Sequence, residues 1–490
     1  MKGNDSLRRE KVFYNFVWRF LERCGAQGVT LIVSIILARL LEPKVYGTLA
    51  LVTVFTTILQ AFVDGGLGNA LIQKKDADDL DFSSVFYFNI AMCLFLYGLM
   101  FFAAPLIAAF YNIHELIPVV RVVSLTLIIS GVKNIEQAYV SKNMMFKKFF
   151  FATLGGTLGA AVLGIWLAYK GYGIWALVAQ NLFNQTVDTV VLWVTVRWHP
   201  KKVFSWTRLR TLLAFGWKLL ASRLIDTFYN EFRSLVIGKI YSSADLAFYN
   251  KGRQFPNLVV NNINDSIDSV LFPTMSNEQK NPETVKNMTR RSISASIYVM
   301  APLLFGLAFC AEPLVKLILT EKWLPCVFYL RVFCVSFVFY PIHTANLNAI
   351  KAMGRSDIFL KLELLKKGVG IAALAATMFI SVEAMAVSTL AVSVINQVIN
   401  SWPNKKLLGY SYISQIKDIF PQICIAALMG VVVYTVQFLP LPSLLIVCIQ
   451  AVSGACLYIG LSILFKIESY HYMRNVLKDI IGRHVREKED

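Results

Sequence analysis

The run from Ser83 to Phe110 decides the class of fold. It reads SSVFYFNIAMCLFLYGLMFFAAPLIAAF and contains no charged residue. A helix needs roughly 20 apolar residues to cross a bilayer. A strand of a membrane β-barrel would instead alternate apolar and polar residues over about ten positions, and this run does not alternate. It therefore predicts a transmembrane α-helix.

Runs of this kind recur along the chain. The protein has 490 residues, of which 56% are hydrophobic and only 16% charged, and its mean hydropathy is +0.57. That is too little polar sequence to cover a soluble globule. We predict an all-α polytopic membrane protein with about fourteen transmembrane helices. The expected spans are approximately 13–41, 46–72, 83–110, 117–140, 149–169, 172–196, 208–240, 245–273, 288–318, 325–350, 357–380, 383–402, 415–437 and 442–465.

The net charge of +18 follows the membrane topology. If the N-terminus is cytoplasmic, about 30 basic residues fall on the cytoplasmic side and about six on the other, which predicts that both termini are cytoplasmic. These residues are spread over many short loops, so they do not indicate a nucleic-acid partner. The N-terminus lacks a secretory cleavage pattern, and we expect its first apolar run to be the first helix.

The cysteines do not indicate a metal site or a disulfide framework. There are eight of them, with no CxxC motif and no Cys/His cluster. Cys310 and Cys326 flank the longest outward-facing loop, so one disulfide remains open there. No cofactor is expected.

The chain contains a weak internal repeat. The stretch Ile36–Asp64 aligns with the sequence about 200 positions later, and Arg121-Val122 aligns with Arg331-Val332 at a shift about ten residues longer. Six spans per repeat place the symmetry axis along the membrane normal.

The repeat predicts two six-helix bundles related by a pseudo-twofold axis, with a cavity between them and alternating access by rocking of the bundles. The expected domains are an N-terminal bundle 1–200, a second bundle 201–404, an extra helix pair 405–465 and a cytoplasmic tail 466–490.

Polar residues concentrate in the seventh and eighth predicted helices. Charge inside a span is costly and should face a cavity or a partner. On the seventh helix, Arg223, Asp226 and Asn230 recur at three and four residues and so share one face, with Glu231 and Arg233 further along. The eighth helix carries a longer stripe of polar side chains, with Asp265 beside it: Asn250, Arg253, Asn257, Asn261, Asn264 and Asp268.

The first repeat carries polar residues in several helices: Arg19, Glu22, Arg23, Asp64, Lys133, Glu136, Gln137, Asn181, Gln185 and Asp188. A planar guanidinium suits a phosphate, and amides suit sugar hydroxyls. The candidate substrate-binding residues are therefore Arg19, Arg23, Lys133, Arg223, Asn230, Arg253, Asn257 and Asn261.

Carboxylates in a dry site can also titrate, so proton or sodium coupling is a second expectation. The candidates for it are Asp226, Glu231, Asp265 and Asp268. Two simpler interpretations stay open. Pairs such as Arg223 with Asp226 could only neutralise each other, and Arg19 and Arg23 could extend to the membrane interface.

Several segments resemble one family. The run LARLLEPKVYG at 37–47, the run FVDGGLGNALIQKK at 62–75 and the segment GYGIWALV at 171–178 resemble Wzx-type polysaccharide exporters. These belong to the multidrug/oligosaccharidyl-lipid/polysaccharide exporter superfamily, and the likeness is strongest to the colanic-acid and teichuronic-acid branch. No site residue is transferred from the family.

The resemblance implies a flippase in the cell inner membrane. Such a protein moves undecaprenyl-diphosphate-linked oligosaccharide repeat units to the outer leaflet for O-antigen, capsule or exopolysaccharide assembly. Its partners would be the lipid-linked glycan, the bilayer, a polysaccharide polymerase and chain-length or export machinery. No enzymatic activity is expected.

Two other functions remain as alternatives. A cation-coupled multidrug exporter of the same superfamily would need an acidic and aromatic cavity. A membrane-embedded polymerase or glycosyltransferase would need a catalytic constellation beside a sizeable outer loop, and the outward connections here are short.

Overall fold

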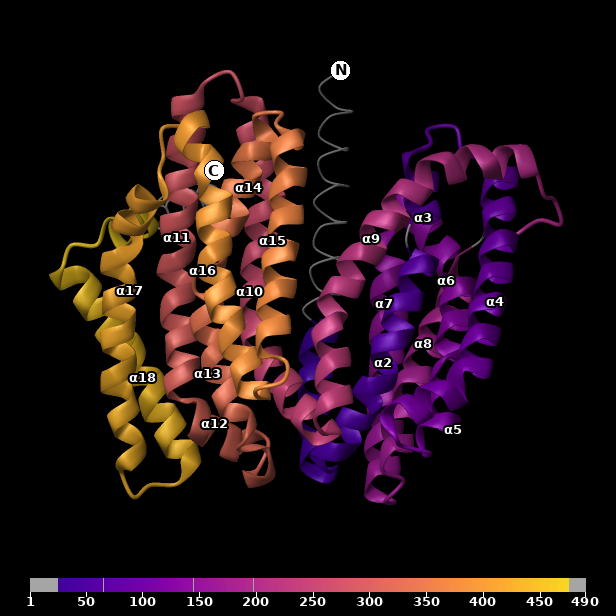
Figure 1. Ribbon diagram of the computed structural model, residues 1–490, viewed down its shortest axis with the longest axis horizontal. Helices are drawn as coiled ribbons and strands as arrows, with labels where there is room; N and C mark the ends of the chain where they lie inside the picture. Colours follow the sequence, from indigo (N-terminus) through magenta and orange to yellow (C-terminus); the bar gives the residue numbers. More distant parts are fainter. Residues whose placement is uncertain (1–24, 65, 144, 197, 476–490) are drawn as a thin grey trace, which may run out of the picture. The chain divides into compact units, whose positions relative to one another are not determined.

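The protein is α-helical throughout the part that the structure describes. A computed structural model describes residues 25–64, 66–143, 145–196 and 198–475, and it assigns no strand within them. Figure 1 shows long helices running side by side within each of two compact units, which divide between Ala247 and Phe248. The predicted all-α fold is confirmed, while the count of fourteen spans stays a prediction.

The first unit contains eight helices after the one at Gly25–Leu40, counted over the described residues. They are α2 (Pro43–Asp64), α3 (Leu67–Gln73), α4 (Asp79–Tyr111), α5 (Leu116–Val123), α6 (Leu125–Lys142), α7 (Phe146–Tyr169), α8 (Ile174–Thr195) and α9 (Trp206–Ile240). Helix α9, which the sequence assigns to the second bundle, packs against α2, α3 and α4. The division of the bundles at residue 200 stays a prediction.

The helix α10 (Ser243–Asn277) leads into the second unit. That unit continues with α11 (Pro282–Phe309), α12 (Ala311–Ile318), the 3-10 turn η1 (Glu321–Trp323), α13 (Cys326–Phe337), α14 (Tyr340–Ala352), α15 (Ser356–Thr377), α16 (Val382–Leu407), α17 (Tyr412–Thr435), η2 (Val436–Phe438) and α18 (Ser443–Leu464). Cys310 and Cys326 are both free thiols.

Most of the long helices are apolar enough to cross a membrane. Within the described residues, nine helical stretches, some made of two successive helices, meet that requirement by length and composition. The helices α8, α9, α10 and α15 are each at least 22 residues long but are not among the nine. Polar side chains interrupt these helices, so they are the natural places to look for a site.

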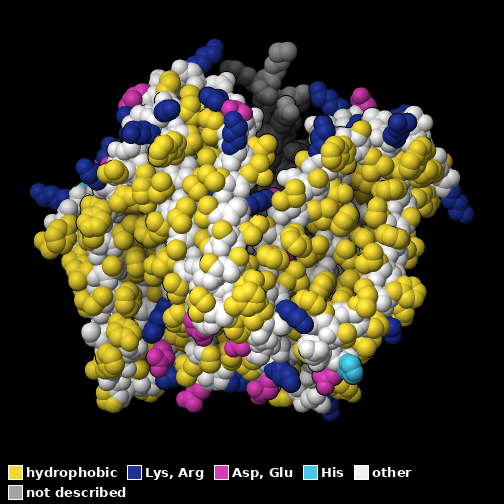
Figure 2. Space-filling model, in the orientation of Figure 1, with side chains coloured by type: hydrophobic (Ala, Val, Ile, Leu, Met, Phe, Trp, Pro, Cys, Tyr) yellow, Lys and Arg dark blue, Asp and Glu magenta, His cyan; other side chains and the backbone are white. Residues whose placement is uncertain are grey.

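Large apolar side chains on the outer faces are consistent with a lipid environment. On α4, Phe102 is 79% exposed and Leu106 is 73% exposed. A helix in water would not expose large apolar side chains in a row. In Figure 2 hydrophobic side chains cover the middle of the helices, and charged side chains gather mainly toward the helix ends. The protein is a multi-pass membrane protein.

Buried serines at the start of α4 hold the segment that leads into α9. The backbone N–H of Lys201 donates to Ser83 Oγ at 3.0 Å, and that of Ser205 donates to Ser84 Oγ at 2.9 Å. Asp78 caps α4 by accepting from the backbone N–H of Asp81, and this hydrogen bond lowers the pKa of Asp78. The two serine contacts hold the segment just before α9 in place.

Glycines then let α9 lie close along α2. A Cβ on Gly66 would lie 2.3 Å from the carbonyl oxygen of Gly216, and one on Gly238 would lie 2.1 Å from Leu51 Cδ2. At Gly66 the obstacle is backbone, so only a residue without a side chain fits there, whereas a larger residue at Gly238 would have to displace the Leu51 side chain. The close packing brings the polar residues of α9 beside those of α2.

The two arginines paired by the repeat make the same contact in the two units. Arg121 Nε donates to the carbonyl of Phe101 at 3.4 Å, and Arg331 Nε donates to the carbonyl of Ala308 at 3.3 Å. Each acceptor lies in the second half of a long helix that precedes the arginine, α4 or α11. An internal repeat predicts such equivalent contacts.

Candidate functional site

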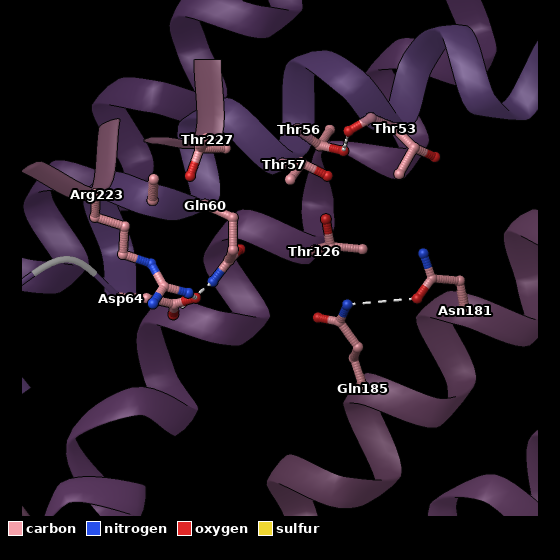
Figure 3. Close-up of a pocket in the computed structure, with 11 residues that line it drawn as sticks. Thr53, Thr56, Thr57, Gln60, Asp64, Thr126, Asn181, Gln185, Arg223 and Thr227 are labelled. Carbon is pink, nitrogen blue, oxygen red and sulfur yellow. Dashed lines mark hydrogen bonds and ion pairs between the residues drawn. The ribbon is translucent and has the colours of Figure 1, made fainter. Parts of the chain in front are cut away.

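One face of α2 lines a polar pocket inside the first unit. Thr53, Thr56, Thr57, Gln60 and Asp64 follow one another at helical spacing, so they project on one side of the helix. They border a cavity of about 210 Å³. The other lining residues come from α2, α6, α8 and α9: Ala61, Thr126, Asn181, Gln185, Arg223 and Thr227. Figure 3 shows their side chains around the pocket.

Three of the threonines that line the pocket have hydroxyl groups that already donate their proton to a backbone carbonyl. Thr53 donates to the carbonyl of Leu49 at 2.8 Å, Thr56 donates to that of Thr53 at 3.0 Å, and Thr126 donates to that of Val123 at 2.7 Å. A hydroxyl that donates to its own helix keeps acceptor lone pairs. These three side chains can therefore accept hydrogen bonds from a hydroxylated ligand.

The charged part of the pocket is formed by Asp64 and Arg223. Gln60 Nε2 donates to Asp64 Oδ1 at 3.0 Å, and Asn134 Nδ2 reaches the same oxygen at 3.3 Å. The second oxygen, Oδ2, lies 3.8 Å from Arg223 Nη2. In Figure 3 the guanidinium lies against Asp64 with the Gln60 amide beside it. Arg223 thus pairs with Asp64, an acid from another helix, while its pairing with Asp226 stays a prediction.

Amides from α8 form a further wall of the pocket. Gln185 Nε2 donates to Asn181 Oδ1 at 3.4 Å, and Gln185 Oε1 accepts from Ser130 Oγ at 3.1 Å. The pocket thus combines one guanidinium and one carboxylate with hydroxyl and amide groups. That set can bind an anion and neighbouring hydroxyls at the same time.

Lys133 lies on α6 and does not line this pocket. Its Nζ lies 3.0 Å from Asp188 Oδ2, and both side chains are largely buried. The charge of Lys133 is therefore neutralised within the first unit. Its predicted contact with substrate stays a prediction.

The remaining α9 candidates lie further along that helix than Arg223. Asp226 and Asn230 are exposed, and Glu231 is half-buried. Arg19 and Arg23 lie outside the described residues, as does the side chain of Asp265. Their roles stay predictions.

The polar stripe of α10 belongs largely to the second unit. Arg253 and Asn257 are half-buried and Asn261 is exposed. Further along the helix, Asp268 Oδ1 accepts from Asn348 Nδ2 at 2.6 Å, and Thr344 Oγ1 donates to Asn264 Oδ1 at 3.4 Å. The last turns of the stripe therefore bind α14.

Sequence reasoning missed the threonine face of α2. Thr53, Thr56, Thr57 and Gln60 are uncharged, and a search for costly charges inside spans passes over them. Their spacing of three and four residues ahead of Asp64 was the available signal. An uncharged polar stripe in an apolar helix is weaker evidence than a charge, because threonine can bond to its own backbone.

The comparison with protein families decides the membership of the chain. The profile of a family described as "Polysaccharide biosynthesis protein" matches residues 36–328. The chain belongs to this family. The resemblance drawn from the sequence is confirmed.

Two curated relatives agree with this family. "Teichuronic acid biosynthesis protein TuaB" of Bacillus subtilis is 25% identical over 78% of this chain and 80% of its own length. "Succinoglycan biosynthesis transport protein ExoT" of Rhizobium meliloti is 26% identical over 65% of this chain, which spans 64% of that relative.

The fold is also that of a solved transporter. "Lipid II flippase MurJ, inward closed conformation" superposes with a TM-score of 0.76 at 16% identity, covering 92% of this chain and 98% of that one. At this identity the likeness shows the fold alone. It agrees with the predicted all-α polytopic membrane fold.

Proposed function

We propose that this family member is a flippase for lipid-linked oligosaccharides. It carries undecaprenyl-diphosphate-linked repeat units from the cytoplasmic to the outer leaflet by alternating access, and it is not an enzyme. One observation carries the proposal. The pocket places the Arg223 guanidinium among hydroxyl and amide groups, inside a unit whose other helices are mostly apolar.

The chemistry of the pocket fits the headgroup of such a substrate. Arginine forms paired, charge-assisted hydrogen bonds with phosphate oxygens. Thr53, Thr56 and Thr126 offer acceptors, and the Asn181 and Gln185 amides offer both donors and acceptors for sugar hydroxyls. The cavity of about 210 Å³ is smaller than the 300–1,000 Å³ that is typical for drug-sized ligands. It therefore takes one part of the headgroup rather than a whole repeat unit.

The names of the relatives support a role in polysaccharide assembly. TuaB is named for teichuronic acid biosynthesis, ExoT for succinoglycan transport, and MurJ for flipping lipid II. By analogy, we place this chain in the cytoplasmic membrane with both termini inside, beside a polysaccharide polymerase and chain-length or export machinery. The positive-inside distribution supports that orientation.

The chemistry of the pocket does not favour a multidrug exporter. A site for organic cations should be acidic and aromatic. The residues that line this pocket include one acidic and one basic side chain and no aromatic ring. A deletion strain separates the flippase from a polymerase.

In that strain we expect lipid-linked repeat units to accumulate on the inner leaflet, and plasmid-borne protein should clear them. A polymerase mutant would instead export single units and attach them. Single exported units in the deletion strain, or normal polymer, would contradict the proposal.

Ion coupling is a separate part of the proposal. Asp226, Glu231, Asp265 and Asp268 are the acids that could couple a proton or sodium ion to the movement. Flipping in proteoliposomes should slow when the coupling gradient is collapsed. An equal rate without any proton or sodium gradient would remove coupling while leaving the flippase proposal intact.

A further inference from the structure

The two members of the Asp64–Arg223 pair are held very unequally. Asp64 Oδ1 accepts from the amides of Gln60 and Asn134 at 3.0 and 3.3 Å. Asn134 is itself fixed, because its Nδ2 also donates to the carbonyl of Val63 at 2.6 Å. The carboxylate is therefore held in one orientation, with Oδ2 directed toward Arg223.

Arg223, by contrast, is held loosely. Its Nη2 lies 3.8 Å from Asp64 Oδ2, beyond normal hydrogen-bond distance. The Arg223 side chain is 57% exposed and that of Asp64 is 38% exposed. An exposed pair at this distance contributes little to stability. The guanidinium thus keeps most of its five N–H donors for a ligand.

We propose that Asp64 is a positioning residue that orients Arg223 into the pocket and competes with the substrate's diphosphate for it, so that the headgroup binds weakly enough to be released. This inference rests on the proposed function. A carrier site must bind its cargo and also let it go. A fixed carboxylate beside the Arg223 guanidinium provides that balance. It repels the incoming anion, and it pairs with Arg223 again when the anion leaves.

The pair also selects the charge of the ligand. A diphosphate gains paired hydrogen bonds from the guanidinium that a single carboxylate at 3.8 Å does not make. A neutral sugar has no charge with which to replace Asp64 as the partner of Arg223, and a cation is repelled by Arg223. The part of a lipid-linked glycan that replaces Asp64 at Arg223 is therefore its anionic part.

Asp64→Asn is the informative substitution. Asparagine has almost the same shape and keeps a side-chain oxygen that accepts from Gln60 and Asn134. It puts an uncharged NH2 group in place of Oδ2, the oxygen that faces Arg223, and so removes the charge that competes for Arg223. We expect affinity for undecaprenyl diphosphate to rise about tenfold, and turnover with the complete lipid-linked substrate to fall, so that KM and kcat decrease together.

The experiment measures binding of undecaprenyl diphosphate to the full chain in nanodiscs, with inorganic pyrophosphate as a second probe. The variants are Asp64→Asn, Arg223→Ala and the double variant. Glu115→Gln is the control, since it removes an exposed acid of the same unit away from the pocket. In the Arg223→Ala background, Asp64→Asn should change affinity by about threefold or less, because there is no guanidinium left for which Asp64 and the diphosphate can compete.

The outcomes separate the two proposals. If Arg223→Ala weakens binding but Asp64→Asn leaves it unchanged or weaker, this inference is overturned and the flippase proposal stands. Tighter binding of pyrophosphate without tighter binding of the lipid would also overturn it. If the wild-type protein binds neither probe, both proposals fall.

Discussion

The first and second units both bury polar side chains, but they use them differently. In the first unit, the polar faces of α2 and α9 border a cavity and leave Arg223 largely exposed. In the second unit, amides of α14, α16 and α17 bind one another. The comparison shows that polar residues in a membrane helix do not by themselves indicate a binding site.

The network in the second unit is built from hydrogen bonds among its own side chains. Asn346 Nδ2 donates to Gln415 Oε1 at 2.8 Å, and Gln415 Nε2 donates back to Asn346 Oδ1 at 3.0 Å. Asn404 Nδ2 also donates to Asn346 Oδ1, at 2.6 Å, and Ser401 Oγ donates to Gln415 Oε1 at 3.1 Å. All four side chains are fully buried. Such a network joins α17 to the other helices of its unit rather than binding cargo.

The Lys133–Asp188 pair gives the largest expected effect. It lies in the first unit, but its two side chains bind each other, as the side chains of the network in the second unit do. Lys133→Met leaves the Asp188 carboxylate buried without its partner. We expect the free energy of unfolding to fall by about 3–5 kcal/mol, measured by thermal melting of the detergent-solubilised protein. The double variant Lys133→Met/Asp188→Leu should recover most of this loss. An unchanged melting temperature in the single variant would show that the pair does not support the fold.

Arg223→Ala should affect transport and leave stability nearly unchanged. Two charge-assisted hydrogen bonds to a phosphate are lost, each worth about 1.5–3 kcal/mol, so flipping in proteoliposomes should fall by about a hundredfold or more. Arg223→Lys keeps the charge but not the planar guanidinium. Its flipping rate should lie between the rates of Arg223→Ala and the wild-type protein. Loss of folded protein in Arg223→Ala, with normal flipping by what remains, would make Arg223 structural.

Gln415→Ala should give the reverse pattern. It leaves the buried Asn346 amide and Ser401 hydroxyl short of partners, which should lower the free energy of unfolding by about 2 kcal/mol. Flipping per folded molecule should stay normal. Gln437→Ala, at a half-buried glutamine after α17, is the matched control. Reduced flipping with normal stability would place the network in the transport path.

Thr57→Val should have the smallest effect. The exchange keeps the shape of the side chain and removes one hydroxyl from the pocket, which should slow flipping by less than about tenfold. Thr435→Val, at an exposed position that does not line the pocket, should flip at the wild-type rate. An equal loss in both variants would mean that the effect is not specific to the pocket.

Part of the site was predictable from residue type and spacing. Arg223 stood out because a charge inside a span needs a reason, and Asn181 and Gln185 stood out as polar residues within the spans of the first repeat. The partner of Arg223 was not predictable in this way. Asp226 lies three residues away on the same helix, whereas Asp64 is far away in sequence and meets Arg223 only because α9 packs along α2.

The amide network shows the same limit. Asn346, Ser401, Asn404 and Gln415 lie on three different helices. Each residue, taken alone, could face lipid, a cavity or a neighbour. Their mutual bonds depend on how α14, α16 and α17 pack.

The sequence by itself determined that this protein is helical, that it lies in a membrane and which family it belongs to. The first two properties follow from local hydropathy, because each span must satisfy its own backbone hydrogen bonds in lipid. The family follows from particular runs of residues, such as those at 37–47 and 62–75. Only the tertiary structure decided which polar residues form a pocket and which neutralise one another. Hydrogen bonds and ion pairs act over a few ångströms between residues distant in sequence, so the packing of whole helices selects the partners.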